Sequence, residues 1–388
     1  NVPCEDEDRF VSSKDYNGPT SFAQKISVAA SLIYSRESMR KFQALCERVR
    51  PDIVHMNLVH RQITLSILDA PYLKTHHVPV LFTSHDYILV CPSYVMLDGS
   101  GNVCDACLGG KFSSCLKRKC VKGSFAKSAM GTLEAEHLKL CKTYRKIDRI
   151  IAPSEFMRQK LIEGGFPARQ VVYMQNFAKQ EILNIASRGS DRTDRDDPYL
   201  LFFGRLSKEK GIDVLVDAFI AAIPSLPANV RLVIAGDGPE RQCIEEKVAS
   251  AGPCVSGRVE LAGFQRGDAL KAYVERASLA IASSRCRENM PYSIVEAFAC
   301  GTPVIGTNIG GIPELVVEGE TGFICEPGSS SSLTEAIVRG FAAFNDQTRY
   351  ASMQASCRAY VLERCSQDTY VKHLTALYRE LIDSKKGN

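Results

Sequence analysis

Short apolar runs alternate with helical patterns along most of this chain. The runs that predict buried strands lie at residues 52–56, 78–83, 149–153, 171–174, 199–203, 230–235, 258–262, 279–282, 303–306 and 322–324. Between them, apolar residues recur every three or four positions, which predicts helices, among them 154–164, 212–223 and 367–384. Strands that alternate with helices are typical of a parallel sheet covered by helices on both faces.

A polar and charged stretch at 187–198 divides this pattern in two. Such a composition is typical of a solvated linker, and a length of 388 residues allows two hydrophobic cores. We therefore predict an α/β protein with two Rossmann-like, doubly wound parallel-sheet domains, at 1–186 and 199–366. We expect the final helix, within 367–388, to pack back on the first domain.

Charge and hydropathy narrow the classes of protein. The formal net charge is only +4, from 48 basic and 44 acidic residues, which gives no reason to expect a nucleic-acid partner. No apolar run approaches the ~18 residues that cross a membrane, so we expect a cytoplasmic protein. A basic stretch is open to two interpretations, a solvated face or contact with an anionic membrane or an acceptor phosphate. It contains Lys111, Lys117, Arg118, Lys119, Lys122, Lys127, Lys139, Lys142, Arg145 and Lys146.

Five of the 15 cysteines are concentrated between residues 91 and 120. Cys104 and Cys107 are separated by two residues, Cys115 and Cys120 by four, and Cys91 precedes them. Four soft ligands at such spacing suit a tetrahedral structural zinc site. Reduced thiols without metal, disulfides and an iron–sulfur cluster remain as alternatives.

Glycine turns follow the predicted strands of the second half, at Gly204, at Gly236 and Gly238, and before Phe264. Ligands of an open parallel sheet bind over the carboxyl ends of its strands, and glycine allows a backbone to approach a ligand closely. Two cations, Arg205 and Lys210, flank the first turn, where a helix N-terminus also favours anions. This combination predicts a diphosphate site.

Two carboxylates, Glu288 and Glu296, are separated by seven residues. The segment between them includes Asn289, Met290 and Pro291, and a helix is predicted to start near Pro291. A carboxylate accepts strong hydrogen bonds from paired hydroxyls, so Glu288 suits a sugar and Glu296 a ribose. The free amides at the helix start suit phosphate oxygens.

These motifs resemble family 4 glycosyltransferases over residues 200–327. The resemblance implies a GT-B fold, retention of the anomeric configuration, a UDP- or GDP-sugar donor and no catalytic metal. It implies that Glu288 is catalytic and contacts the transferred sugar, whereas Glu296 contacts the ribose. The remaining implied donor-binding residues are Gly204, Arg205, Lys210, Gly236, Gly238, Phe264, Asn289, Met290 and Pro291.

The first half also resembles this family, at residues 51–55 and 83–87, which implies that His85 is a catalytic residue near the sugar. The cysteine cluster resembles an insert of a bacterial subfamily. Family members begin with a strand and a glycine-rich loop that this chain lacks, so we expect N-terminal strands to be missing. The resemblance also implies a glycan or lipid-linked acceptor, in surface polysaccharide or glycolipid biosynthesis at the inner face of a membrane.

Two other functions share this fold and pocket. One is an inactive protein that binds sugar nucleotides as a scaffold. The other is a different GT-B enzyme, such as a sugar-nucleotide epimerase. The combination of Arg205, Lys210, Glu288 and Glu296 favours the transferase over both.

Overall fold

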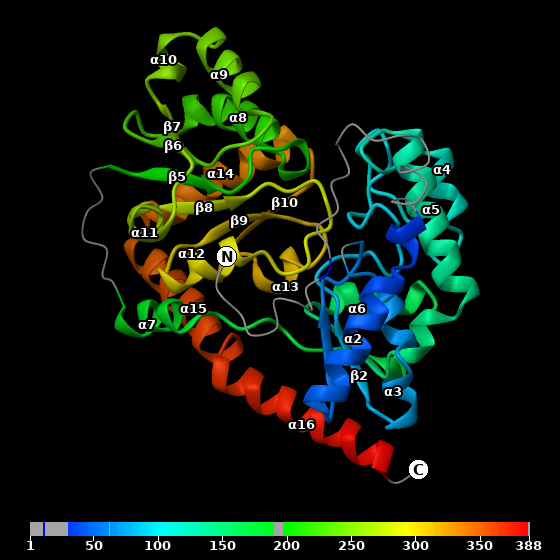
Figure 1. The fold of residues 1–388 in the computed structure, drawn as a ribbon. Coiled ribbons are helices and arrows are strands. Elements are labelled where there is room, and N and C mark those ends of the chain that lie inside the picture. Colours follow the sequence, from blue (N-terminus) through cyan, green and yellow to red (C-terminus); the bar gives the residue numbers. More distant parts are fainter. Residues whose placement is uncertain (1–10, 12–29, 62, 190–196, 387–388) are drawn as a thin grey trace. The chain divides into compact units, whose positions relative to one another are not determined.

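The computed structural model describes residues 11, 30–61, 63–189 and 197–386 (Figure 1). The expected loss of N-terminal strands concerns residues outside these ranges, as does most of the predicted linker at 187–198. The chain forms two compact units. Unit 1 comprises residues 1–153, 157–174 and 372–388, and unit 2 comprises residues 154–156 and 175–371.

Unit 1 is built on a parallel sheet of four strands in the order β1-β2-β3-β4. The strands are β1 (Val54–Asn57), β2 (Val80–Thr83), β3 (Arg149–Ala152) and β4 (Val171–Tyr173). The helices are α2 (Arg36–Val49), α3 (Pro71–Thr75), α4 (Ser113–Lys117), α5 (Phe125–Leu140) and α6 (Glu155–Glu163), with 3-10 turns at Leu65–Asp69, Thr143–Lys146 and Ala168–Gln170.

Unit 2 is built on a parallel sheet of six strands in the order β10-β9-β8-β5-β6-β7. The strands are β5 (Tyr199–Phe203), β6 (Arg231–Ala235), β7 (Val259–Gly263), β8 (Leu279–Ala282), β9 (Val304–Thr307) and β10 (Gly322–Cys325). The helices are α7 (Gln180–Arg188), α8 (Ile212–Ala222), α9 (Arg241–Ser250), α10 (Pro253–Ser256), α11 (Gly267–Arg276), α12 (Tyr292–Ala299), α13 (Ile312–Leu315), α14 (Ser330–Asn345), α15 (Gln347–Arg364) and α16 (Gln367–Lys386), with 3-10 turns at Lys208–Lys210 and Ile223–Ser225.

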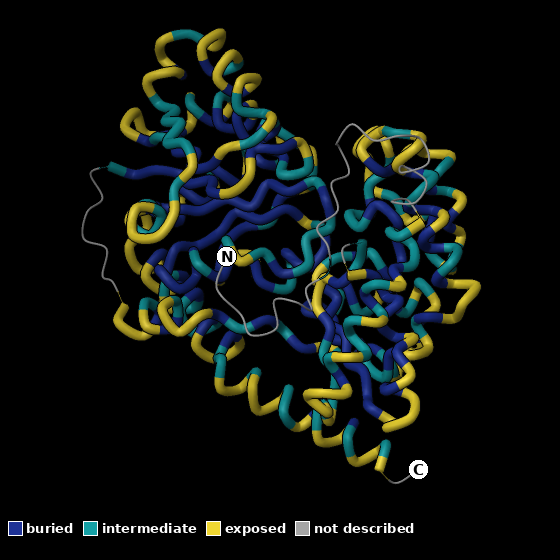
Figure 2. The backbone as a smooth tube through the Cα atoms, in the orientation of Figure 1, coloured by how far each residue is buried: buried dark blue, intermediate teal, exposed yellow. Residues whose placement is uncertain are grey.

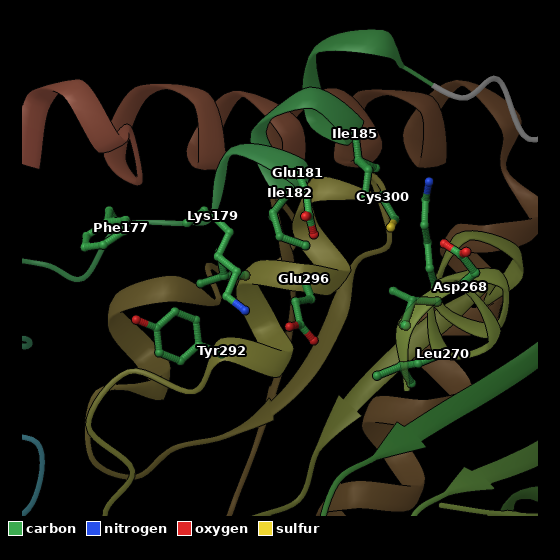
Figure 3. A pocket seen from close by; sticks show the side chains of 15 residues that line it. Phe177, Lys179, Glu181, Ile182, Ile185, Asp268, Leu270, Tyr292, Glu296 and Cys300 are labelled. Atoms are coloured by element: carbon green, nitrogen blue, oxygen red, sulfur yellow. The ribbon is translucent and has the colours of Figure 1, made fainter. Parts of the chain in front are cut away.

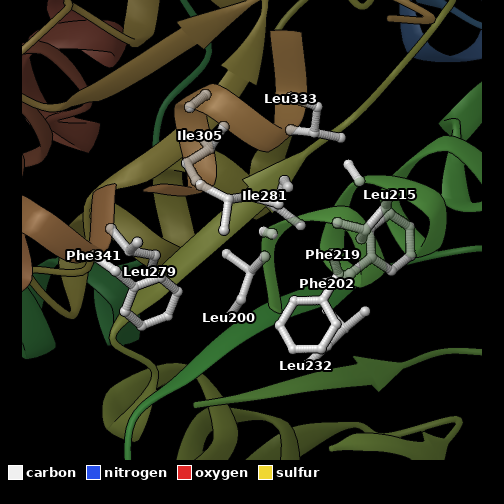
Figure 4. Packing of buried hydrophobic residues seen from close by; sticks show 14 of the residues in the cluster. Leu200, Phe202, Leu215, Phe219, Leu232, Leu279, Ile281, Ile305, Leu333 and Phe341 are labelled. Atoms are coloured by element: carbon white, nitrogen blue, oxygen red, sulfur yellow. The ribbon is translucent and has the colours of Figure 1, made fainter. Parts of the chain in front are cut away.

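The alternation of side chains along β5 gives unit 2 a core on each face of its sheet. Leu200 and Phe202 point into one core, which includes residues of α8 and α14 (Figure 4). Tyr199, Leu201 and Phe203 point into the other, which includes residues of α12 and α15. All five residues are buried, and the central strands are dark blue in Figure 2. Strands buried on both faces must be almost continuously apolar, which is why short apolar runs located them correctly.

The predicted strands agree with the observed ones within one or two residues at each end. The boundary between the two units differs more from the predicted one. The main segment of unit 2 starts at Gln175, so α7 belongs to unit 2, whereas the sequence predicts that residues up to 186 belong to the first domain. The amphipathic pattern of α7 identified a helix, but its partners, α12 and α15, lie far along the sequence.

The C-terminal helix α16 contributes to both units, and its residues from Lys372 onward belong to unit 1. There, the Tyr378 hydroxyl shares a 2.7 Å hydrogen bond with His55 Nδ1, and the other ring nitrogen of His55 lies 2.7 Å from Thr83 Oγ1. Arg149 donates to Glu380 over 2.9 Å. His55 therefore has a structural role that connects the sheet of unit 1 to α16.

Phe219 provides a test of the core in unit 2. Its side chain on α8 is fully buried in the first core (Figure 4). We expect Phe219→Ala to lower the free energy of unfolding of unit 2 by about 3–5 kcal/mol, because lost burial and the remaining cavity both contribute. Leu362→Ala, at a side chain with 39% exposure, should change it by less than ~0.5 kcal/mol. Urea unfolding followed by circular dichroism measures both, and equal effects would contradict this packing.

His60 provides a test of unit 1. Its ring lies edge-on to Phe82 with centroids 5.8 Å apart, and its Nε2 is buried without a hydrogen-bond partner among the described residues. Burial, together with the nearby charge of Arg61, lowers the pKa of His60 to about 3. In the unfolded chain the pKa is ~6.5, so on acidification the unfolded state takes up a proton that the folded state does not.

We therefore expect the stability of unit 1 to fall as the pH drops below about 6.5. Between pH 7 and pH 5 the loss due to His60 is roughly 2 kcal/mol. His60→Gln lacks this histidine and should not show this loss. Between pH 7 and pH 5, the free energy of unfolding of the parent should therefore fall by roughly 2 kcal/mol more than that of the variant. His373→Gln, at an exposed residue of α16, is the control. A difference that does not change with pH would show that His60 is not buried in the neutral form.

Candidate functional site

The carboxyl ends of the strands in unit 2 carry loops whose backbones touch each other. A Cβ on Gly236 would lie 1.9 Å from the carbonyl oxygen of Gly204, and one on Gly310 would lie 2.3 Å from that of Glu288. Gly310 also has a φ of +63°, which favours glycine. The sequence predicts a ligand close to the backbone at Gly236. In the structure the nearest group to Gly236, and likewise to Gly310, is the neighbouring loop, so these glycines allow the loops themselves to assemble.

Lys210 and Glu288 meet where two of these loops lie side by side. The loops follow β5 and β8, which are neighbours in the sheet. Lys210 Nζ lies 2.6 Å from Glu288 Oε1, and the Ser284 hydroxyl donates to the same oxygen over 2.8 Å. The thiol of Cys286 is a third donor to Oε1, at 3.6 Å. Glu288 Oε2 has no hydrogen-bond partner in the part of the chain that is described, so this oxygen is available to a ligand.

The environment of this pair keeps Lys210 protonated. Burial alone would lower the pKa of Lys210, but the charge of Glu288 and its hydrogen bond hold this pKa above the ordinary value. Burial and the Glu288 charge together raise the pKa of Cys286 to about 12. At neutral pH Lys210 is therefore an ammonium group and Cys286 a neutral thiol.

The loop that carries Glu288 is fastened to the start of α8. The Ser283 hydroxyl donates to the carbonyl oxygen of Lys210 over 2.8 Å. The Arg285 backbone donates to the carbonyl oxygen of Glu209 over 2.8 Å, and its guanidinium donates to Asp213 over 2.9 Å. These bonds fix the loop on both sides of Ser284. The Lys210–Glu288 contact is thus supported by one main-chain bond and two side-chain bonds, and does not depend on its own two flexible side chains alone.

The predicted donor-binding residues after Glu288 lie at the start of α12. Asn289 Oδ1 accepts a hydrogen bond from the Ser154 hydroxyl over 2.8 Å, and Met290 is buried. Pro291 is the N-cap of α12 and makes no capping bond through its side chain. Arg205 is exposed, and Phe264 is 71% exposed. The helix start therefore offers amides and a positive dipole end beside Glu288.

Glu296 lines a separate cavity of about 690 Å³ in unit 2 (Figure 3). The cavity lies between α7, α11 and α12, and Lys179 and Tyr292 contribute to its wall together with apolar side chains such as Ile182 and Leu270. Burial raises the pKa of Glu296, and the charge of Lys179 acts against this shift. A carboxylate and an ammonium group in an apolar wall suit a ligand that is itself part polar and part apolar.

Some residues of the site were not identified from the sequence. Ser284 was missed, although a hydroxyl residue two positions after a predicted strand and four residues before Glu288 was a usable signal. Lys179 and Tyr292 carried no such signal. Lys179 precedes α7, a helix that we had assigned to the other domain, and only the tertiary structure brings it to Glu296.

His85, the predicted catalytic residue of unit 1, lies two residues after the end of β2. Its Nε2–H donates to Asn57 Oδ1 over 2.9 Å. Desolvation lowers the pKa of His85, although the neighbouring Asp86 acts in the opposite direction. The ring is therefore neutral at pH 7, with the proton on Nε2, and Nδ1 can accept a hydrogen bond.

The cysteine cluster of unit 1 does not form the predicted metal site. Cys107, Cys115 and Cys120 are buried in a small apolar cluster with Phe112 and Val121. Burial, with further contributions from neighbouring thiols, raises the pKa of Cys120 to about 12. Within the described ranges, no three His, Cys, Asp or Glu side chains are placed so that they could hold a metal ion. The zinc site predicted at Cys104, Cys107, Cys115 and Cys120 is thus not supported by the placement of these side chains. The fourteen cysteines of the described residues are free thiols.

Both halves of the chain match models of known protein families. Residues 4–179 match the model described as Glycosyltransferase Family 4, and residues 197–342 match the model described as Glycosyl transferases group 1. Lipopolysaccharide 1,2-N-acetylglucosaminetransferase of Salmonella typhimurium is 31% identical over 211 residues, covering 50% of this chain and 53% of that protein. N-acetyl-alpha-D-glucosaminyl L-malate synthase of Bacillus anthracis is 29% identical over 189 residues, covering 48% of this chain and 47% of that protein. The matched segments thus span about half the length of these relatives.

Solved structures resemble this chain over most of its length. The crystal structure of Anabaena HepE in complex with UDP has a TM-score of 0.62 at 19% identity, and the match covers 88% of this chain and 82% of that one. Sucrose-phosphate synthase from Thermosynechococcus elongatus has a TM-score of 0.64 at 20% identity, covering 95% and 82%. These likenesses, with two parallel-sheet units, confirm the predicted GT-B fold. With both halves matched in order, the chain belongs to the family 4 glycosyltransferases.

Proposed function

We propose that this protein transfers a sugar from a nucleotide-diphosphate sugar to an acceptor. The observation that carries the proposal is the contact of Lys210 with Glu288, placed at the carboxyl ends of β5 and β8. Ligands of open parallel sheets bind at this edge. A cation next to a carboxylate with one free oxygen offers one group to a phosphate and one to a sugar hydroxyl.

The leaving diphosphate would be stabilised by fixed positive charge. Lys210 is held protonated beside Glu288, Arg205 is exposed at the end of β5, and the first-turn amides of α12 are free of side-chain caps. Charge that is in place before the bond breaks lowers the barrier without reorganisation of the site. These groups would contribute most of the rate, so the reaction needs no metal in this proposal.

The same geometry supports retention of the anomeric configuration without a covalent intermediate. Glu288 already accepts bonds from Lys210 and Ser284, and a carboxylate shared with two strong donors is a poor nucleophile. It suits a hydrogen-bonding role toward the transferred sugar. His85 is the second catalytic residue in this proposal, because its neutral ring keeps Nδ1 as an acceptor.

The donor would be a UDP- or GDP-sugar with its ribose at Glu296. The cavity at Glu296 has a volume within the ~300–1,000 Å³ of small-molecule sites. The related fold of Anabaena HepE was solved with UDP and with UDP-glucose. Lys179 lines the same cavity, and its positive charge acts on Glu296 in the direction that favours the carboxylate form.

The acceptor would be a glycan or a lipid-linked glycan. Two relatives are described as a lipopolysaccharide N-acetylglucosaminetransferase and a lipopolysaccharide core biosynthesis glycosyltransferase. These descriptions support our proposal that the enzyme acts in surface polysaccharide or glycolipid synthesis, in the cytoplasm at the inner face of a membrane. Among the residues described, none of the helices has the length and apolarity to cross a membrane.

Glu288→Gln tests the transfer step. The substitution keeps the shape of the side chain and removes its charge, so the Lys210 ammonium loses its anionic partner. We expect product formation from a panel of UDP- and GDP-sugars, offered lipid and glycan acceptors, to fall by about a hundredfold or more. Glu363→Gln, at an exposed residue of α15, should leave it unchanged.

Two results would contradict the proposal. Equal activity of both variants would remove Glu288 from the mechanism. A parent protein that binds these donors and transfers nothing to any acceptor would favour the inactive scaffold.

Glu296→Gln tests the ribose contact by calorimetric titration with UDP. A hydrogen bond to a charged group contributes ~1.5–3 kcal/mol, so we expect the dissociation constant to rise about ten- to hundredfold. The loss should be absent for 2′,3′-dideoxyuridine diphosphate, which has no ribose hydroxyls to donate. Glu181→Gln, in the wall of the same cavity, is the control. An equal loss for both ligands would show that Glu296 acts on another part of the donor.

A further inference from the structure

Residues 154–156 form a short segment of unit 2 that comes from a distant part of the chain. Ser154 is buried, and its hydroxyl donates to Asn289 Oδ1 over 2.8 Å. The guanidinium of Arg287 lies over the ring of Phe156, 5.6 Å from the ring centroid. The 154–156 segment therefore contacts the loop after β8 at two residues, one on each side of the carboxylate of the candidate site.

Glu314 of α13 holds this segment by its main chain. Glu314 Oε2 accepts the N–H of Glu155 over 2.9 Å, and Oε1 accepts the N–H of Phe156 over 2.7 Å. The first amides of a helix have no partner within the helix, and a negative charge at this end is favourable. One carboxylate thus satisfies two amides at the start of α6 through charge-assisted hydrogen bonds.

The turn that precedes Glu314 packs against the main chain of the Glu288 loop. The Gly311 N–H donates to the carbonyl oxygen of Glu288 over 2.8 Å. A Cβ on Gly311 would lie 1.9 Å from the carbonyl oxygen of Asn289 and 3.0 Å from the Ser154 Cβ. The turn therefore lies between the loop and the 154–156 segment, and no larger residue fits at Gly311 without movement of the main chain.

Glu314 is thus connected to Glu288 in two ways. The first connection is through Gly311, three residues earlier in the chain, which bonds to the carbonyl oxygen of Glu288. The second is through the 154–156 segment, which bonds to Asn289. The charge contact described above fixes the Glu288 carboxylate, whereas these contacts fix the main chain from which that side chain extends.

We propose that Glu314 is a positioning residue of the sugar transfer, because its carboxylate sets the place of the Glu288 main chain. This inference rests on the proposed function, in which Glu288 hydrogen-bonds to the transferred sugar. A displacement of about 1 Å at a reacting group can lower a rate about a hundredfold. Release of the 154–156 segment would let the Glu288 loop move while the sheet and the α12 amides keep their places, so the transfer step would lose more than nucleotide binding.

Other roles of Glu314 predict different kinetics. A carboxylate that only stabilises the start of α6 would lower the free energy of unfolding when it is removed, and the folded enzyme would keep its rate. A carboxylate that contacts the donor directly would raise KM for the donor when it is removed. The positioning role predicts a lower kcat, an unchanged affinity for the donor, and an effect that depends on Ser154.

The first experiment measures kcat and KM of Glu314→Gln with the donor and acceptor that the parent uses. Gln has the size of Glu, but it offers one acceptor oxygen in place of two and turns an NH2 group toward the other amide. We expect kcat to fall about tenfold or more, while KM for the donor and the dissociation constant of UDP stay within about threefold of the parent values.

The control for this experiment is Glu318→Gln. The Glu318 carboxylate also accepts a main-chain N–H, that of Ile324 over 2.7 Å, and it pairs with Arg339 at 3.3 Å. Its replacement therefore removes the same charge and a bond of the same kind from the same region of the chain. We expect this variant to keep the kcat of the parent.

The second experiment is a double-mutant cycle with Ser154→Ala. This substitution removes the bond to Asn289 and leaves both main-chain bonds of Glu314 in place. We expect Ser154→Ala to lower kcat about fivefold. The double variant should be no slower than Glu314→Gln alone, because both substitutions release the same segment, whereas independent effects would multiply.

Three results would overturn the inference: a kcat of Glu314→Gln equal to that of the parent, an equal loss in Glu318→Gln, or losses that multiply in the double variant. Circular dichroism shows whether each variant is folded. If Glu314→Gln is not, an unchanged kcat of Ser154→Ala overturns the inference by itself. A parent that transfers no sugar overturns the proposed function and this inference together, whereas an active parent with an equally active, folded Glu314→Gln overturns the inference alone.

Discussion

The charge contact between Lys210 and Glu288 organises the edge of unit 2 on which the proposed chemistry depends. It joins the loop after β5 to the loop after β8, and both side chains are more than half removed from water. Removing a carboxylate from water without a cation beside it would cost free energy. The cost is offset because Lys210, Ser284 and Cys286 all point at one oxygen. The same arrangement leaves the other oxygen and the positive charge available to a bound donor.

The backbone around this contact explains why the site is rigid. The glycines at 236 and 310 remove the Cβ atoms that would separate neighbouring loops, and the bonds of Ser283 and Arg285 then lock the loop to the start of α8. These contacts between neighbouring loops therefore fix the position of Glu288 relative to the strands of the parallel sheet. Catalytic groups that are held in this way need little reorganisation during a reaction.

Unit 1 shows how similar residue patterns can serve different purposes. Its cysteines have a spacing that suits a metal, yet Cys107, Cys115 and Cys120 pack with Phe112 as a small apolar core. That core supports the region of α4 and α5. His55 uses both ring nitrogens to connect β1 and β2 to α16, whereas for His85 only Nε2 has a hydrogen-bond partner among the described residues. Spacing along the chain did not distinguish these cases, since each depends on what packs against the side chain.

The sequence by itself determined the strands and the α/β class, and it supplied most of the residues that we propose for the donor site. Strands buried on both faces must be short and apolar, and ligand-binding residues of a parallel sheet must follow those strands, so both leave a local pattern in the chain. Only the tertiary structure decided which residues from distant segments meet. Lys179 reaches Glu296 because α7 packs on α12, Ser284 reaches Glu288 through the curve of one loop, and the thiols of unit 1 are desolvated by their neighbours. Burial and contact between distant residues depend on how the whole chain packs, so they cannot be read from the spacing of apolar residues within one segment.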